Sequence, residues 1–170
     1  MPLRCAANAE RLPFRDGSFD LVTANMVVEH LDDPQRQFRE IARVTAPGGL
    51  FVIHTPNALG YPTVVSRMVP RRLKTGLARY LDGRGNTDVY RTFYRANTGR
   101  SLRALASASS FRIEALQFVR SVPVFAFVLP IAVVELAWAR LLANERLSRL
   151  RGNIIATLEK MDASANMQRA

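Results

Sequence analysis

The sequence contains very little cysteine, histidine and lysine. Its single cysteine, Cys5, has no second cysteine with which to form an internal disulfide, so nothing suggests an oxidising compartment. The two histidines, His30 and His54, do not have the spacing of a metal site, and we expect no metal. The first ten residues contain one arginine and no apolar core of about seven residues or more, unlike a signal peptide. We therefore expect a cytoplasmic protein.

The sequence also lacks an apolar run long enough to cross a membrane. The longest run, from Val122 to Val134, has thirteen residues, contains Pro123 and Pro130, and ends at Glu135. A spanning helix needs about 20 residues. A helix that is buried or covers a substrate is the first interpretation, and attachment peripheral to a membrane is the second; the two are compatible.

The net charge of +10 is unevenly distributed. Residues 61–120 carry twelve basic and three acidic residues, whereas residues 1–60 carry six and seven. Such a block could meet anionic lipid, a phosphate-bearing substrate or nucleic acid through non-specific attraction. Because 22 of the 24 basic residues are arginine, codon composition alone could also explain it, and a solvated basic face is preferred. The aromatic-basic run at 90–95 has no recognised motif, so no nucleic acid is expected.

The first sixty residues predict a strand, a helix and a second strand. "FDLVTAN" at 19–25 is rich in strand-forming residues. A helix is expected at 34–45, with Asp33 as N-cap and Pro34 at the first position, stopped by the tight turn "PGG" at 47–49. "LFVIHTP" at 50–56 is a near-continuous apolar run, typical of a strand buried on both faces of a parallel sheet. These elements form a βαβ unit with a right-handed crossover.

The remaining sequence predicts a less regular continuation of the same domain. Residues 57–96 are expected to form a basic insertion or lid of irregular helices and loops. From Asn97-Thr98 a helix is expected, with Leu102, Leu105 and Ala106 inward, and then the strand "FRIEALQFV". Residues 121–150 predict an apolar helical insertion, "NIIATLEK" at 153–160 a fourth strand, and 161–170 a tail. The fold class is α/β, in a single domain at 1–160.

Three short motifs occur together in an order that carries a family resemblance. They are "NAERLPF", the strand "FDLV" leading to "EHL", and "PGG" before an apolar strand. With this spacing, the run from Asn8 to Asn57 resembles class I S-adenosylmethionine-dependent methyltransferases of the type 11 small-molecule branch. The resemblance implies part of a Rossmann-like sheet, consisting of family strands 4, 5, 6 and 7, whose full order is 3-2-1-4-5-7-6. It implies S-adenosyl-L-methionine as cofactor and a small or lipid-like methyl acceptor. The usual Gly before Phe111 is replaced by Ser110.

The resemblance also assigns candidate site residues. In an open α/β sheet, ligands bind outside the carboxyl ends of the strands, and Asn25 lies at such an end. The family pattern implies that Asn25 lines the cofactor cleft, that Asn8 lies beside the adenine amino group, and that the Ala9 backbone N–H contacts the adenine ring. His30 is a candidate base toward the acceptor, or a residue that only caps or packs. His54 borders the pocket or is a hydrogen-bonded core histidine.

Some family features have no counterpart in these residues. The family's first strand, its glycine-rich loop and the acidic residue that binds the ribose are missing; the only Gly-x-Gly, at 83–85, follows no strand. We therefore expect a truncated domain with an incomplete cofactor site. The first strand is then left as a sheet edge, which favours dimerisation. Catalysis by this chain alone stays open, and the alternative is a non-catalytic remnant or a membrane-surface binding module.

Overall fold

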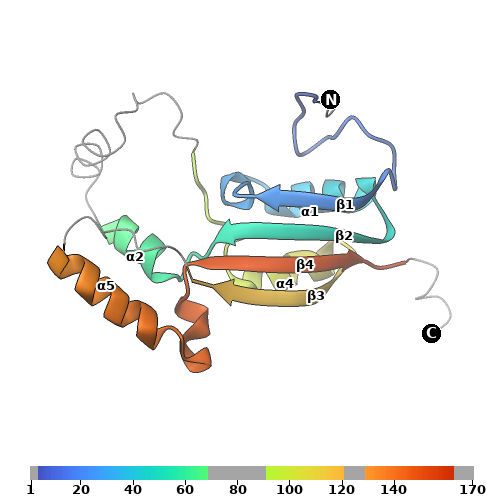
Figure 1. The fold of residues 1–170 in the computed structure, drawn as a ribbon. Coiled ribbons are helices and arrows are strands. Elements are labelled where there is room, and N and C mark those ends of the chain that lie inside the picture. Colours follow the sequence, from blue (N-terminus) through green and yellow to red (C-terminus); the bar gives the residue numbers. More distant parts are fainter. Residues whose placement is uncertain (1–3, 69–90, 121–128, 163–170) are drawn as a thin grey trace.

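The structure, a computed structural model, describes residues 4–68, 91–120 and 129–162, which contain a four-stranded sheet (Figure 1). The sheet order is β1-β2-β4-β3, in which β2 runs parallel to β1 and β4 runs antiparallel to both of its neighbours. This is the order expected for family strands 4, 5, 7 and 6, so the predicted α/β fold class is confirmed. The strands are β1 Phe19–Asn25, β2 Thr45–Pro56, β3 Phe111–Val119 and β4 Asn153–Lys160.

The helices begin close to where the sequence predicts them. Asp33 accepts a hydrogen bond from the Arg36 backbone N–H at 3.1 Å, and Thr98 and Ser101 form a reciprocal capping box. Both caps satisfy backbone donors that a helix leaves unpaired at its start. The described helices are α1 Pro34–Val44, α2 Tyr61–Met68, α4 Gly99–Ala108 and α5 Leu129–Leu141, with 3-10 turns η1 Val28–His30 and η2 Glu145–Leu150.

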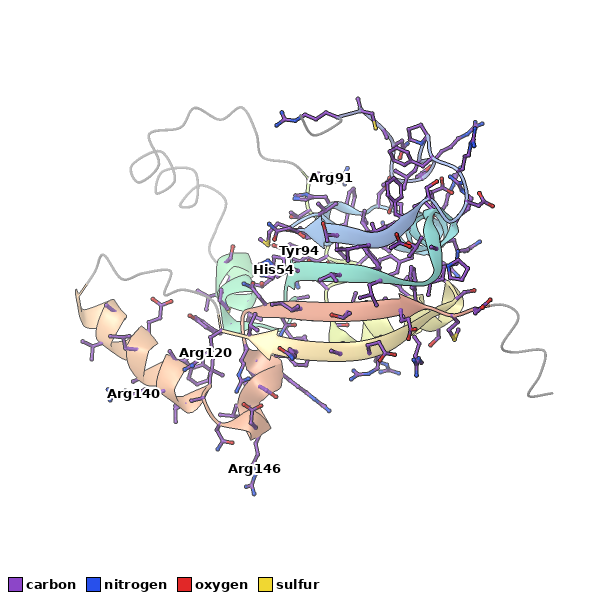
Figure 2. All side chains as sticks on the ribbon, turned by 45° about the vertical axis from the view of Figure 1, so that its right-hand side comes forward. His54, Arg91, Tyr94, Arg120, Arg140 and Arg146 are labelled. Carbon is purple, nitrogen blue, oxygen red and sulfur yellow. The ribbon has the colours of Figure 1, made fainter. Side chains whose placement is uncertain are left out.

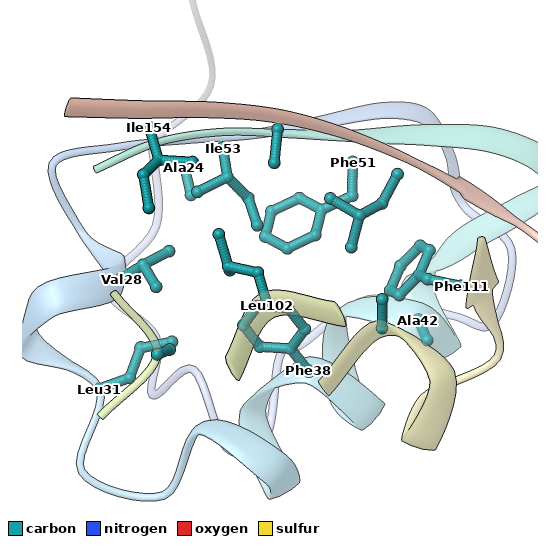
Figure 3. Close-up of a cluster of buried hydrophobic side chains, with 14 residues drawn as sticks. Ala24, Val28, Leu31, Phe38, Ala42, Phe51, Ile53, Leu102, Phe111 and Ile154 are labelled. Atoms are coloured by element: carbon teal, nitrogen blue, oxygen red, sulfur yellow. The ribbon is translucent and has the colours of Figure 1, made fainter. Parts of the chain in front are cut away.

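The hydrophobic core lies between one face of the sheet and helices α1 and α4 (Figure 3). Phe51 on β2 is its centre, with ring centroids 5.6 Å from Phe38 on α1 and 5.8 Å from Phe111 on β3. From α4, Leu102 and Ala106 are buried and Leu105 is partly buried, as predicted. Aromatic and aliphatic burial of this kind supplies most of the stabilisation of such a layer.

The opposite face of the sheet is not covered by a helix in the part of the chain described. Leu21 on β1 is 56% exposed and its register partner Leu50 on β2 is 37% exposed, whereas Phe51 and Ile53 on the helix side are fully buried. The prediction that residues 50–56 are buried on both faces is therefore wrong. Helices α1 and α4 lie on one side only, and α2 and α5 lie beyond the carboxyl ends of β1 and β2 (Figure 1).

The residues predicted to form a turn before the second strand instead form a bulge within it. Thr45 already pairs with Phe19, and the ladder resumes where Leu50 pairs with Leu21. Gly48 lies inside the bulge with φ of 74°, a conformation that glycine adopts without steric cost. Strand β2 is therefore longer than predicted.

Two predicted segments lie only partly within the described residues. Of the insertion at 57–96, the structure describes α2 and the segment from residue 91, and residues 69–90 lie outside the description. Of the apolar helical insertion, it describes α5 and η2 but not residues 121–128, and of the tail at 161–170 it describes only Met161 and Asp162. None of the helices in the described ranges combines the length and the apolar character that crossing a bilayer requires.

Candidate functional site

The candidate site centres on Asn25 and His54, which end two parallel strands side by side. They are register partners on β1 and β2, and His54 Nδ1 lies 2.7 Å from Asn25 Oδ1. Because a carboxamide oxygen can only accept, Nδ1 carries the proton, and Nε2 holds the lone pair of the neutral ring. Since Val22 and Ala24 pack into the core, the alternation along β1 places Asn25 on the uncovered face.

A tight turn immediately after β1 holds this strand end in place. Met26 has φ of 54°, in the left-handed region that a long side chain rarely adopts, and its N–H donates to the His54 carbonyl oxygen at 2.8 Å. Residues in this conformation are common at functional sites, where surrounding contacts fix them. The turn directs the chain from β1 into η1, where Glu29 and His30 lie.

A buried hydrogen-bond network lies under the same end of the sheet, on its helix side. The Glu29 carboxylate is only 3% exposed and accepts a hydrogen bond from Thr55 Oγ1 at 3.0 Å. Thr55 Oγ1 in turn accepts from Asn97 Nδ2 at 2.6 Å. The Glu29 backbone oxygen accepts from the N–H groups of Phe93 and Tyr94 at 2.8 and 3.2 Å. The network therefore ties the segment 91–98 to the ends of β1 and β2.

His30 is bonded to this same segment. Its Nδ1 lies 3.0 Å from the Arg91 backbone oxygen, so Nδ1–H is the donor. The ring is half-buried at the end of η1, and Figure 2 shows Arg91, Tyr94 and His54 at this end of the sheet. His30 bonds to Arg91 and His54 bonds to Asn25, so the two histidines are separate candidates for handling a proton. The catalytic role of His30 stays a prediction.

The segment that carries Asn8 and Ala9 is folded on itself and joined to α1. Asn8 Oδ1 accepts from the Glu10 backbone N–H at 2.9 Å, so one acceptor position of the amide serves its own turn. Glu40 on α1 accepts from the Leu12 N–H at 2.7 Å, and Arg43 bonds to Glu40 at 2.7 Å. The hydrogen bond from Arg43 lowers the pKa of Glu40 to about 2, and the Glu40 carboxylate raises that of Arg43. A charged pair on α1 thus holds the chain at Leu12, three residues after Ala9.

Sequence reasoning found Asn25, His30 and His54 at this end but missed Thr55 and Asn97. Asn97 was expected only near a helix start, yet its side chain is fully buried, donates to Thr55 and to the Pro56 oxygen, and leaves Oδ1 without a partner in the described residues. These partners lie 42 and 41 residues away in the chain, a separation that local patterns do not reveal. No three His, Cys, Asp or Glu side chains within the described ranges are grouped as metal ligands.

Comparison with known families matches the chain through β1 and most of β2. Residues 3–53 match the methyltransferase domain family. A demethylmenaquinone methyltransferase from Mycolicibacterium paratuberculosis is 37% identical over 90 residues, which cover 51% of this chain and 39% of that protein. An uncharacterised methyltransferase from Mycobacterium sp. (strain JLS) is 40% identical over 84 residues, covering 49% of this chain and 30% of the relative. The chain thus spans less than half the length of these curated relatives.

Solved structures share the fold over nearly all of this chain. An S-adenosylmethionine-dependent methyltransferase from Mesorhizobium loti has a TM-score of 0.53 at 17% identity and covers 91% of this chain and 67% of its own. The cyclase SpnF has a TM-score of 0.51 at 19% identity, and the match covers 92% of this chain and 55% of the SpnF chain. Because a cyclase shares the fold, the fold alone does not decide the reaction.

The family match and the sheet order agree with each other. Residues 3–53 match the methyltransferase domain family, and the described residues have the fold of the class I S-adenosylmethionine-dependent methyltransferases. S-adenosyl-L-methionine is the cofactor that this class implies, and the residues present fit it in part. Asn25, exposed at the strand end with its oxygen engaged by His54, keeps two amide N–H donors for an adenosine group.

Proposed function

We propose that this chain forms the adenine side and the acceptor side of an S-adenosylmethionine-dependent methyltransferase. The observation that carries the proposal is the pairing of Asn25 with His54 at the carboxyl ends of two parallel strands, next to the segment that matches the family. Ligands of open α/β sheets bind at this position. The relatives named for demethylmenaquinone support an acceptor that is small or lipid-like, of the quinone kind.

Each residue of the site has a proposed task, taken for Asn8 and Ala9 from the family pattern and supported for Asn25 by its contact with His54. Asn25 donates its amide N–H groups to the adenosine part of the cofactor, because His54 already engages its oxygen. The Ala9 backbone N–H contacts the adenine ring, and Asn8 presents its amide group beside the adenine amino group. The cofactor, when bound, supplies a methyl group activated by a positively charged sulfur.

The two histidines are the candidates for accepting a proton from the methyl acceptor. His54 presents Nε2 on the uncovered face of the sheet, and His30 lies on η1 with Nδ1 bonded to Arg91. A histidine contributes as a base only if its ring nitrogen lies within hydrogen-bond distance of the methyl acceptor. Alignment of the acceptor atom with the methyl group supplies much of the rate by itself. We assign the buried network of Glu29, Thr55 and Asn97 a positioning role: it holds the ends of β1 and β2 in place and does not contact the substrate.

We propose further that the cofactor site is incomplete in this chain alone. The glycine-rich loop and the ribose-binding acid of the family are missing from the 170 residues, and β1 is an edge strand beside an uncovered face. A second copy or another segment that pairs with β1 would supply the neighbour that the family places there. Cofactor affinity of the isolated chain should therefore fall in the millimolar range.

The test is an NMR titration of the chain with S-adenosylhomocysteine, the stable product of the cofactor. We expect weak binding, with chemical-shift changes concentrated at Ala9, Asn25 and His54. Asn25→Ala should remove these changes, whereas Gln117→Ala, at an exposed position on the opposite edge of the sheet, should leave them intact. Micromolar affinity would refute the incomplete site, and changes at other residues or none at all would refute the site itself.

The acceptor class needs a separate titration. A water-soluble naphthohydroquinone should perturb the resonances of His54, His30 or both, and a saturated alcohol of similar size should not. Equal responses to the two compounds would remove the support for a quinone-like acceptor. The alternative function, a non-catalytic module at a membrane surface, depends on α5 instead of this strand end.

A further inference from the structure

Helix α5 buries its only acidic residue and exposes several of its large apolar side chains. Glu135 is only 6% exposed and accepts a hydrogen bond from the Tyr61 hydroxyl on α2 at 3.1 Å. The side turned away from α2 carries Arg140 and four large apolar side chains, Val133, Val134, Leu136 and Leu141, which are 59, 69, 55 and 56% exposed. We call these four residues the outward face of α5.

Such a distribution is unfavourable for a helix that faces water alone. A surface helix normally buries its aliphatic side chains and exposes its charges, and a helix that is apolar all round is normally buried. The inward side of α5 is already satisfied, because Leu142 is buried and Trp138 lies beside Tyr61 with ring centroids 6.5 Å apart. The outward face therefore requires a partner outside the described chain.

Three arginines without ion partners among the described residues lie on α5 and on the 3-10 turn that follows it. Arg140 lies on α5, and Arg146 and Arg149 lie on η2 directly after it. The two carboxylates of this stretch are engaged elsewhere: Glu135 is turned inward, and Glu145 pairs with Arg151 at 2.6 Å. Figure 2 shows Arg140 and Arg146 directed away from the sheet.

We propose that α5 docks on the surface of an anionic lipid membrane. Apolar side chains enter the boundary between headgroups and acyl chains, and arginines beside them meet the lipid phosphates. A second copy of the chain fits less well, because a twofold contact would bring Arg140 of each copy together with no carboxylate on the face to offset them. The inference goes beyond the proposed methyl transfer and stands without it, because none of its residues belongs to the cofactor site.

The single tryptophan of the chain, Trp138, gives a direct measurement of this docking. It lies on α5 half-buried, with Nε1 unbonded within the described residues. We would co-sediment the full chain with phosphatidylglycerol-containing vesicles and with pure phosphatidylcholine vesicles. Trp138 fluorescence would be recorded with acyl chains that carry bromine as quencher. Binding is expected for the anionic vesicles only, with quenching of Trp138, and should weaken at about 0.5 M salt as the charges are screened.

Matched variants distinguish binding through the outward face of α5 from non-specific hydrophobic binding. The double variant Val134→Gln with Leu136→Gln should lower the vesicle partition coefficient about tenfold, since two apolar side chains no longer enter the lipid. Leu21→Gln, on β1 and 56% exposed like Leu136 at 55%, should leave the partition coefficient unchanged. Arg140→Gln should reduce binding to anionic vesicles and flatten its salt dependence. Circular dichroism and a urea denaturation curve report that each variant is still folded.

Each outcome decides the proposal. Docking through α5 is supported if the double variant loses vesicle binding and the Leu21→Gln control keeps it. The proposal is overturned if the chain does not pellet with anionic vesicles at low salt. It is also overturned if the Leu21→Gln control loses as much binding as the double variant. A dimer detected by analytical ultracentrifugation, abolished by the double variant and without vesicle binding, assigns the face to a second copy and also overturns it. Cofactor binding at Asn25 is measured separately, so failure of either proposal leaves the other standing.

Discussion

His54 Nδ1 donates a hydrogen bond to Asn25 Oδ1 across 2.7 Å, and the two residues are register partners on parallel strands. The contact fixes the ring tautomer, because the partner of one ring nitrogen determines where the proton of the neutral imidazole lies. It also orients the Asn25 amide so that its N–H donors face away from His54. One side-chain contact therefore prepares both a donor for a ligand and an acceptor nitrogen.

The first prediction concerns this tautomer. In nitrogen-15 spectra recorded at a pH where the His54 ring is uncharged, the ring should show a protonated Nδ1 and an unprotonated Nε2. Asn25→Ala should allow His54 to return to the Nε2–H form that is usual in water. His30 is the internal control, because its Nδ1–H donates to the Arg91 oxygen and should not respond. An unchanged His54 pattern in Asn25→Ala would show that the contact does not govern the tautomer.

The second prediction concerns the buried network below the site. Thr55→Val removes the hydroxyl that donates to Glu29 and accepts from Asn97, and leaves a buried carboxylate without that donor. We expect a loss of about 2 to 3 kcal/mol in the free energy of unfolding, measured by urea denaturation. Thr23→Val on the neighbouring strand is the matched control, because Thr23 is exposed, and should cost less than about 0.5 kcal/mol. Similar losses in the two variants would contradict a supporting role for the network.

The third prediction is a pH dependence from Glu40. Its pKa is lowered from 4.5 to about 2 by the Arg43 hydrogen bond, so the folded state holds this carboxylate charged more strongly than the unfolded state does. The contribution to stability is therefore fully present above about pH 4.5 and is lost as the pH falls toward 2. Glu40→Gln should lower stability at pH 7 by about 1 kcal/mol, a value discounted for solvent screening, and should lose less stability between pH 5 and 3 than the wild type. Parallel pH profiles for the two proteins would refute this.

The fourth prediction concerns a close backbone approach between α2 and the start of β4. A Cβ at Gly60 would lie 2.7 Å from the Arg151 backbone oxygen, so Gly60→Ala must separate the two segments. We expect a loss of about 2 to 3 kcal/mol in unfolding free energy. Gly48→Ala is the comparison, because its φ is 74° but no atom lies within 4 Å of the added carbon; backbone strain alone should cost about 1 kcal/mol. A smaller effect at Gly60 than at Gly48 would contradict the close approach.

The sequence predicts the fold well where local signals determine it. The caps at Asp33 and Thr98 and the strands at 19–25, 111–119 and 153–160 are in place because turn chemistry and side-chain periodicity act over a few residues. The position of Asn25 at a strand end follows from the same signals. The family resemblance then supplies the strand order, which periodicity alone does not give.

The features that the sequence does not reveal depend on contacts between distant segments. Thr55 bonds to Glu29 26 residues away, and the outward face of α5 becomes visible only once Tyr61 on α2 engages Glu135. An apolar run such as "FVLPIAVV" is equally compatible with a helix buried in a protein core and with a helix that faces lipid. The expected burial of 50–56 on both faces failed for a similar reason, since a run of apolar residues does not show whether a second layer of helices is present.

The uncovered face and the edge strand β1 of the described sheet would couple the two proposed binding events thermodynamically. A polypeptide that pairs along β1 and covers Leu21 and Leu50 would bury exposed apolar surface on the same strand whose end carries Asn25. If that polypeptide also contacted an adenosine ligand at Asn25, affinity for the polypeptide and affinity for the ligand would be reciprocal, each raising the other by the same factor. Under the proposed function, the open side of the sheet would make cofactor binding a cooperative property of the chain and its partner.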